Sequence, residues 1–190
     1  GFFKAQSLSE EVKLFEDQTS FYFPRQLMDK GNQPNFSLAD YISPAGDDHI
    51  GLFAVTAGHG IENIIKEYQA KNDDYSEIMA KVLADRLAEA AAEWLHKKVR
   101  TEYWGYSKDE DLDLNAMLYE KYCGIRPAPG YPACPDHKEK DKIWKLLNVE
   151  EQIGISLTES RAMFPAASVC GWYFSHPKAR YFSVLKNKVL

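Results

Sequence analysis

The chain has 190 residues, of which 45% are hydrophobic and 27% charged, and its net charge is −5. These values describe one ordinary globular domain with a sizeable core. The negative charge argues against a nucleic-acid-binding surface. No apolar run approaches the ~20 residues that a membrane-spanning helix needs, so we expect neither nucleic acid nor a membrane as a partner.

Several motif classes are missing from the sequence. Its three cysteines, Cys123, Cys134 and Cys170, form no C-x-x-C pair, which argues against a disulfide framework or a structural zinc site and predicts a reducing, cytoplasmic setting. There is no G-x-S-x-G elbow and no complete phosphate-binding loop. The chain opens without an initiator methionine or a signal-peptide pattern, as expected for a piece of a longer protein.

The first 70 residues predict short strands followed by one helix. A strand is expected at 1–5, and an apolar patch at 21–23 is stopped by a proline. Further strands are expected at 38–42 and 49–56, on either side of a turn. After a glycine break, residues 61–70 predict a short helix.

The clearest predicted element is a helix from Asp74 to about residue 103, with Asp73 or Asp74 as its N-cap. Apolar side chains recur along it at helical spacing and predict one buried stripe. The stripe consists of Tyr75, Met79, Leu83, Leu87, Ala90, Ala91 and Trp94.

A polar row runs beside this stripe and contains Asp85, Glu89 and His96. Glu89 allows two interpretations: it faces a pocket and accepts hydrogen bonds from a ligand's hydroxyl groups, or it lies on a solvated helix edge. The residues alone favour the solvated edge. Asp85 and Glu89 would suit acid–base chemistry as a pair, but a structural ion-pair network is the simpler interpretation.

The C-terminal third predicts two helices and three strands. The helices are expected at 111–122 and 136–149, the second with Asp136 as N-cap and Glu139 as its capping-box partner. Both faces of the strand at 168–174 are apolar, which predicts a central strand covered on both sides. The other expected strands are at 155–158 and 181–184, the latter joined to 168–174 by a hairpin turn.

The most unusual segment is a proline-rich run at 126–135, which holds four of the nine prolines together with Arg126, Gly130 and Tyr131. Proline excludes an interior helix or a central strand here. A stiff strip with free carbonyls, a glycine for close approach and a guanidinium suited to carboxylates would make a cradle for a small polar ligand. A surface loop wrapping the outside of the core is the plainer alternative.

Residues 125–137, Ile125-Arg-Pro-Ala-Pro-Gly-Tyr-Pro-Ala-Cys-Pro-Asp-His137, closely resemble the signature of the C-terminal activation domain of cobalamin-dependent methionine synthase. The string Leu157-Thr-Glu-Ser160 is also similar to that family. Other similar segments are at 1–5, 73–90, 165–168, 171–175 and 181–184. The resemblance implies one α+β domain over residues 1–190, truncated at both ends. It also implies a twisted antiparallel sheet flanked by long helices, unlike a Rossmann methyltransferase.

The resemblance further implies that the domain binds S-adenosylmethionine in a shallow groove. By this resemblance Arg126 holds the methionyl carboxylate, and Glu89 contacts the ribose. Tyr181 lies near the sulfonium, with Phe182 beside it. These roles agree with the chemistry of a guanidinium fork, an ionised carboxylate and an aromatic wall.

The proline-rich run supplies the other implied ligand contacts. Backbone groups around Ala128, Pro129, Gly130 and Tyr131 are expected to hold the adenine and the methionyl amine. No catalytic residue and no metal ligand are expected in this chain.

The family reaction transfers a methyl group from methyltetrahydrofolate to homocysteine through methylcobalamin. Cobalt is occasionally oxidised to an inactive state, and the activation domain then presents S-adenosylmethionine while a flavodoxin or a flavodoxin-like reductase supplies an electron. The implied partners are therefore that reductase and the cobalamin-binding module of the same enzyme. No D-x-H-x-x-G motif occurs here, so cobalamin is expected on another module and the fragment alone is not expected to be catalytic.

Two departures qualify the resemblance. An Asp-Trp-x-Pro-Phe segment that contacts the ligand in the family is absent, which implies weaker affinity, and residues 11–35 and 185–190 match poorly. A stand-alone adaptor that docks a corrinoid protein or reductase without the methyl donor is the alternative function. An unrelated hydrolase using Asp85 or Glu89 is a third.

Overall fold

The computed structural model describes residues 1–27 and 31–184. Five strands form one sheet in the order β3-β2-β1-β4-β7, and every neighbouring pair is antiparallel. A separate two-stranded sheet pairs β5 with β6. The strands are β1 (Phe2–Leu8), β2 (Glu11–Leu14), β3 (Ser20–Tyr22), β4 (Asp48–Thr56), β5 (Ser156–Leu157), β6 (Met163–Phe164) and β7 (Ser168–Tyr173).

One long helix dominates the helical part. The side chain of Asp73 caps α2 by accepting a hydrogen bond from the Ser76 backbone N–H, and a π-helical turn at Val99–Tyr103 continues the helix. Among the described residues, no helix is long and apolar enough to cross a membrane. The α-helices are α1 (Ile61–Ala70), α2 (Asp74–Lys98), α3 (Leu114–Leu118), α4 (Glu139–Leu147) and α5 (Val149–Ile153).

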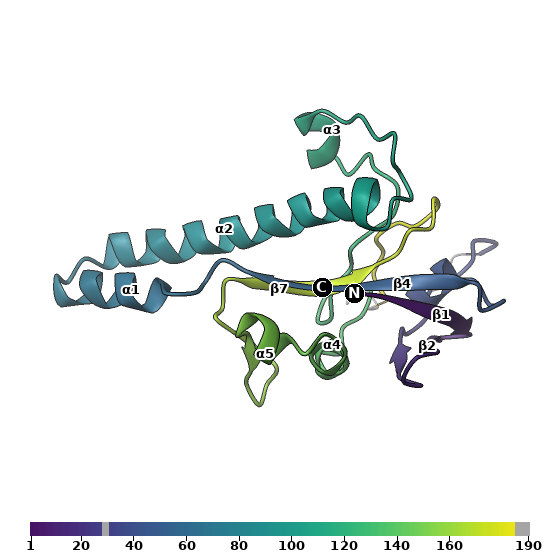
Figure 1. Cartoon of the computed structure of the whole chain (residues 1–190), viewed down its shortest axis with the longest axis horizontal. Coiled ribbons are helices and arrows are strands. Elements are labelled where there is room, and N and C mark those ends of the chain that lie inside the picture. Colours follow the sequence, from purple (N-terminus) through teal and green to yellow (C-terminus); the bar gives the residue numbers. More distant parts are fainter. Residues whose placement is uncertain (28–30, 185–190) are drawn as a thin grey trace.

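The sheet separates two groups of packed side chains. α2 lies over one face of β4 and β7, and α4 covers the other face (Figure 1). Side chains alternate along β7, so that Trp172 joins the large core with α4 while Tyr173 joins the smaller cluster under α2. The strand at 168–174 is thus buried on both faces, as its composition predicts.

The strand prediction is nevertheless wrong about position, because β7 is the last strand of the sheet rather than a central one. Its outer edge is closed by the start of the proline-rich run. The Trp172 N–H donates to Pro127 O at 3.0 Å, and Ile125 and Phe174 exchange two backbone hydrogen bonds of 3.0 Å. Proline lacks an N–H but keeps its carbonyl, so the run can end the sheet without continuing it.

The stripe prediction for α2 is also wrong. The buried residues of the helix are Ala84, Ala88, Ala92 and His96, whereas Leu83 and Leu87 of the expected stripe are 55% and 62% exposed. Only the C-terminal half of α2 lies over the sheet, and small alanines allow the helix backbone to approach it closely. The N-terminal half projects beyond the sheet with α1 alongside (Figure 1). We call α1 and this half of α2 the helical arm.

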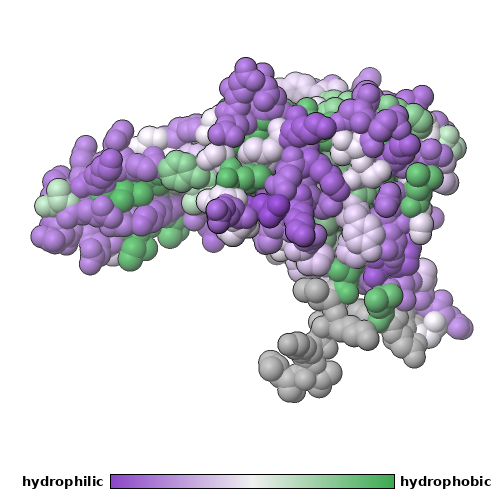
Figure 2. Space-filling model, turned by 90° about the horizontal axis from the view of Figure 1, so that it is seen from below, coloured by the Kyte–Doolittle hydropathy of each residue, from purple (hydrophilic) through white to green (hydrophobic). Residues whose placement is uncertain are grey.

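The arm carries apolar side chains on its surface. Figure 2 shows apolar patches among polar side chains along this projection. A hollow of about 400 Å³ between α1 and α2 is lined by residues that include Ile64, Tyr75, Met79 and Leu83.

Two of the other local predictions are confirmed and two are wrong. The strand at 49–56 and the helix at 61–70 are confirmed as β4 and α1. Residues 38–42, expected as a strand, contain a 3₁₀ helix at Leu38–Tyr41, because the Ser37 and Asp40 side chains form a capping box. Residues 181–184 form no strand.

The two later helices are shorter than expected. Only Leu114–Leu118 is helical within 111–122. In 136–149 the helix begins at Glu139, and Asp136 instead accepts a hydrogen bond from the Lys138 backbone. The expected capping box is absent because the Glu139 carboxylate pairs with Lys142 at 2.8 Å.

Candidate functional site

The candidate site is a cavity of about 360 Å³ beside β7 and the proline-rich run, within the size range of small-molecule sites. Residues from α2, the segment after α3, the proline-rich run, β7 and the C-terminal segment meet there. The lining residues are Glu89, Glu120, Arg126, Pro127, Ala128, Tyr131, Pro132, Ala133, Met163, Ser168, Val169, Cys170, Tyr181 and Phe182.

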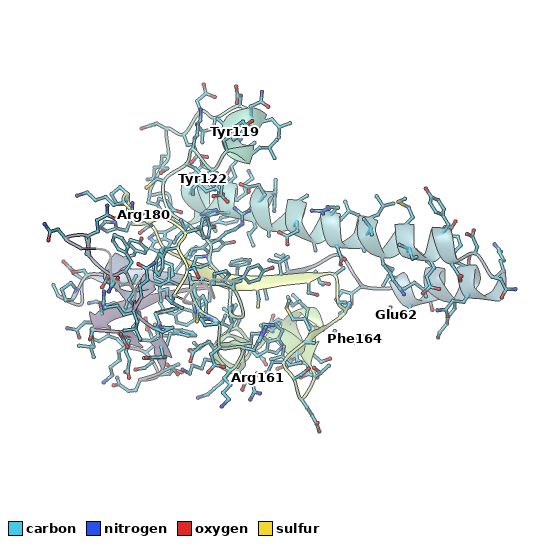
Figure 3. The ribbon with its side chains drawn as sticks, turned by 180° about the vertical axis from the view of Figure 1, so that it is seen from behind. Glu62, Tyr119, Tyr122, Arg161, Phe164 and Arg180 are labelled. Atoms are coloured by element: carbon cyan, nitrogen blue, oxygen red, sulfur yellow. The ribbon has the colours of Figure 1, made fainter. Side chains whose placement is uncertain are left out.

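Arg126 is the cation of this cavity and is held from several directions. Its Nη2 lies 2.7 Å from Glu93 Oε2 on α2. Its Nη1 donates to the Tyr122 hydroxyl at 2.7 Å and lies 3.3 Å from His96 Nδ1. Figure 3 shows Tyr122 beside the C-terminal half of α2, which carries both other partners. The guanidinium is therefore fixed before any ligand arrives.

Burial shapes the protonation of the groups around Arg126. The pKa of His96 is lowered to about 2, first by burial and then by the positive charges of Arg100 and Arg126. Burial likewise raises the pKa of Tyr122 to about 12. At neutral pH both side chains are therefore uncharged.

The aromatic side of the cavity comes from the C-terminal segment. The Tyr181 hydroxyl accepts a hydrogen bond from the Arg126 backbone N–H at 3.1 Å, and burial raises the pKa of this phenol. Phe182 packs against the main core and lies 6.0 Å, ring to ring, from Phe36. Tyr181 and Phe182 thus give the cavity an aromatic part.

The structure brings six of the eight sequence-predicted residues to the cavity lining: Glu89, Arg126, Ala128, Tyr131, Tyr181 and Phe182. Pro129 and Gly130 do not line it. The Gly130 N–H donates to Cys134 O at 2.8 Å. A Cβ on Gly130 would lie 2.1 Å from His137 Cε1, so the group that approaches this glycine closely is a histidine of the same chain.

Sequence reasoning missed Glu120 and the support behind Arg126. Glu120 lies just after α3 with a φ of +51°, and no sequence motif predicts this backbone conformation. Glu93 has no sequence signal of its own, and Tyr122 was only the end of an expected helix. The π-helical turn and the fold of β7 bring these groups together, and neither can be read from spacing.

A protein family and a solved structure are similar to this chain. A family described as "Vitamin B12 dependent methionine synthase, activation domain" matches residues 1–188. The chain belongs to this family. The expected resemblance is confirmed, and the chain is an activation domain of this family.

A solved structure described as "Crystal Structure of the MetH Reactivation Domain bound to AdoHcy" is similar to this activation domain. The two share 47% sequence identity with a TM-score of 0.93, and the match covers 97% of this chain. The chain spans 59% of that structure's length. The expected α+β fold with an antiparallel sheet is thereby confirmed.

Proposed function

We propose that this activation domain binds S-adenosylmethionine in the cavity at Arg126 and presents the methyl group for reductive remethylation of cobalamin in methionine synthase. The observation that carries the proposal is the anchored Arg126 guanidinium facing a cavity with two carboxylates and an aromatic wall. The 47% identical relative described as bound to AdoHcy supports the same ligand class.

Four parts of the ligand have a chemically matched group in the lining. A guanidinium suits the methionyl carboxylate, and Glu89 suits the ribose hydroxyls as an acceptor. Glu120 adds a second carboxylate, which suits the methionyl ammonium. The ring of Tyr181 suits a sulfonium cation. This chain's contribution is therefore to bind and orient the methyl donor.

The remaining parts of the reaction belong to other components. When bound on its own module, cobalamin supplies the metal centre that accepts the methyl group. We propose that the domain docks onto that module while a flavodoxin or flavodoxin-like reductase delivers the electron. The domain alone is then expected to bind the ligand without turning it over.

Isothermal titration with S-adenosylmethionine and S-adenosylhomocysteine tests the proposal. Arg126→Ala removes a charge-assisted contact and should weaken binding by roughly 1.5–3 kcal/mol. Arg161→Ala is the matched control, because Arg161 also pairs with a carboxylate, that of Asp141 at 2.8 Å, but lies on the far side of the sheet from Tyr122 (Figure 3). It should leave the affinity unchanged.

Two results would contradict the proposal. If the wild-type chain binds neither ligand, the methyl-donor site is wrong. If it captures a corrinoid protein equally well with and without Arg126→Ala and never binds the ligand, the adaptor function replaces it.

A further inference from the structure

The back of the Arg126 guanidinium is enclosed by three acceptors from two parts of the chain. Glu93 Oε2 lies 2.7 Å from Nη2, the Tyr122 hydroxyl 2.7 Å from Nη1, and His96 Nδ1 3.3 Å from Nη1. Glu93 and His96 are three residues apart on α2, so they share one face of the helix. None of these three acceptors lines the cavity; they lie behind the residue that does.

Counting donors shows what this enclosure leaves free. A guanidinium has five N–H donors in a fixed plane. Within the described residues, Nη1 donates to Tyr122 and lies within hydrogen-bond distance of His96, while Nη2 forms an ion pair with Glu93 Oε2 at 2.7 Å. Nε makes no hydrogen bond among the described residues, so the edge formed by Nε and Nη2 keeps donors in the two-pronged arrangement that matches a carboxylate.

His96 can play this part in only one tautomer. Arginine donates and never accepts, so Nδ1 must be the unprotonated nitrogen. The proton then lies on Nε2, which donates to the Tyr106 hydroxyl at 3.2 Å. The imidazole stacks on the Tyr173 ring with centroids 5.0 Å apart, and Tyr122 contacts it edge-on at 5.0 Å. These contacts fix the plane of the ring.

The charged groups around His96 keep it an acceptor. Arg100 follows it on the same helical stretch and Arg126 faces it from the proline-rich run, while Glu93 pairs with Arg126 rather than with the imidazole. The titratable groups facing the ring from other segments are the phenols of Tyr106, Tyr122 and Tyr173. Burial beside two cations holds the pKa of His96 far below neutrality.

A second layer fixes Tyr122 itself. The Arg100 guanidinium lies 3.9 Å from the centre of the Tyr122 ring. Arg100 is fully buried and forms two hydrogen bonds to Glu110, at 2.7 and 2.8 Å. The order of support thus runs from Glu110 through Arg100 and Tyr122 to Arg126.

We propose that His96 is a positioning residue for the methyl donor. With Glu93 and Tyr122 it occupies the rear donors of Arg126, so that the remaining two-pronged edge is aimed at the ligand's carboxylate. This inference rests on the proposed function and adds to it the residue that orients the carboxylate contact.

Two substitutions of His96 separate orientation from packing. His96→Asn places an amide oxygen as many bonds from Cα as Nδ1 and keeps the acceptor, whereas His96→Leu removes it. S-adenosylhomocysteine is the probe, and 5′-methylthioadenosine, which lacks the amino-acid group, is its control ligand. For S-adenosylhomocysteine we expect about a fivefold to tenfold higher Kd in His96→Leu and less than a twofold change in His96→Asn. For 5′-methylthioadenosine neither variant should change the Kd.

Several outcomes overturn the positioning role. Equal weakening of both ligands by His96→Leu would show a structural effect, and equal weakening of S-adenosylhomocysteine by both variants would show that the acceptor is irrelevant. A nitrogen-15 spectrum of the wild type with a proton on Nδ1 of His96 would exclude the bond to Arg126, whatever the variants do. Wild-type binding with one of these results refutes the positioning role alone, whereas no wild-type binding refutes the proposed function as well.

Discussion

The two halves of α2 belong to one continuous helix but have different surroundings. The C-terminal half lies over β4 and β7 with alanines against the sheet and a buried polar network at its end. The N-terminal half leaves the sheet and carries exposed apolar side chains such as Ile78 and Leu83, with α1 beside it. The comparison teaches that the small residues, rather than the large apolar ones, mark where this helix packs.

The largest expected difference is between the buried ion pair just beyond the C-terminal half of α2 and a surface ion pair on the arm. Glu110→Ala leaves the Arg100 cation fully buried without its partner, which should lower the free energy of unfolding by about 3–5 kcal/mol. On the arm, Glu77→Ala removes only the pair with Lys81 on the helix surface and should cost no more than about 0.5 kcal/mol. Urea denaturation of both variants measures the contrast, and similar losses would mean that the two halves are equally exposed.

A second contrast tests the packing directly. Ala92 is fully buried against the sheet, so Ala92→Leu should overpack the contact and destabilise the chain by about 1–3 kcal/mol. Leu83→Ala on the arm should change stability by less than about 0.5 kcal/mol. If Leu83→Ala lowered the stability more than Ala92→Leu, the helix would have to be buried through its leucine rather than through its alanines.

The smallest contrast is a pH effect that only the C-terminal half should show. His96 has a pKa of about 2 in the folded state and about 6.5 when unfolded. Below pH 6.5 the unfolded chain therefore binds a proton that the folded chain does not, and stability falls as pH falls. From pH 6.5 to 5 the wild type should lose up to about 2 kcal/mol more than His96→Leu. If the denaturation midpoints of the wild type and of His96→Leu had identical pH slopes, His96 would not be the cause of the pH dependence.

Sequence patterns within a short window predicted the elements that short-range interactions determine. β4 and α1 follow from alternation, helical spacing and flanking glycines, and they are found where expected. The buried stripe failed because periodicity cannot tell which face has a partner. The edge position of β7 depends on contacts distant in sequence, such as Trp172 with Pro127, which no window of residues contains.

Some residues of the candidate site could be predicted from the sequence and others could not. Arg126 and Tyr131 stand out in the proline-rich run, and the family resemblance proposed Glu89, Tyr181 and Phe182, all of which line the cavity. The support from His96 and Tyr122 escaped prediction, since its members gain their meaning only from the bonds they make across elements. From the sequence alone, a histidine on a helix cannot be told apart from any other polar residue there, because its contacts with other elements are unknown.

The proline-rich run has a consequence beyond the candidate site. An outermost strand exposes unpaired backbone groups that can recruit a strand from another molecule. Here Pro127 accepts the bond offered by Trp172, and proline has no N–H to offer a further strand in return. The segment that carries Arg126 therefore also protects this edge of the sheet against intermolecular pairing. A change that detached it would be expected to promote aggregation as well as weaken binding.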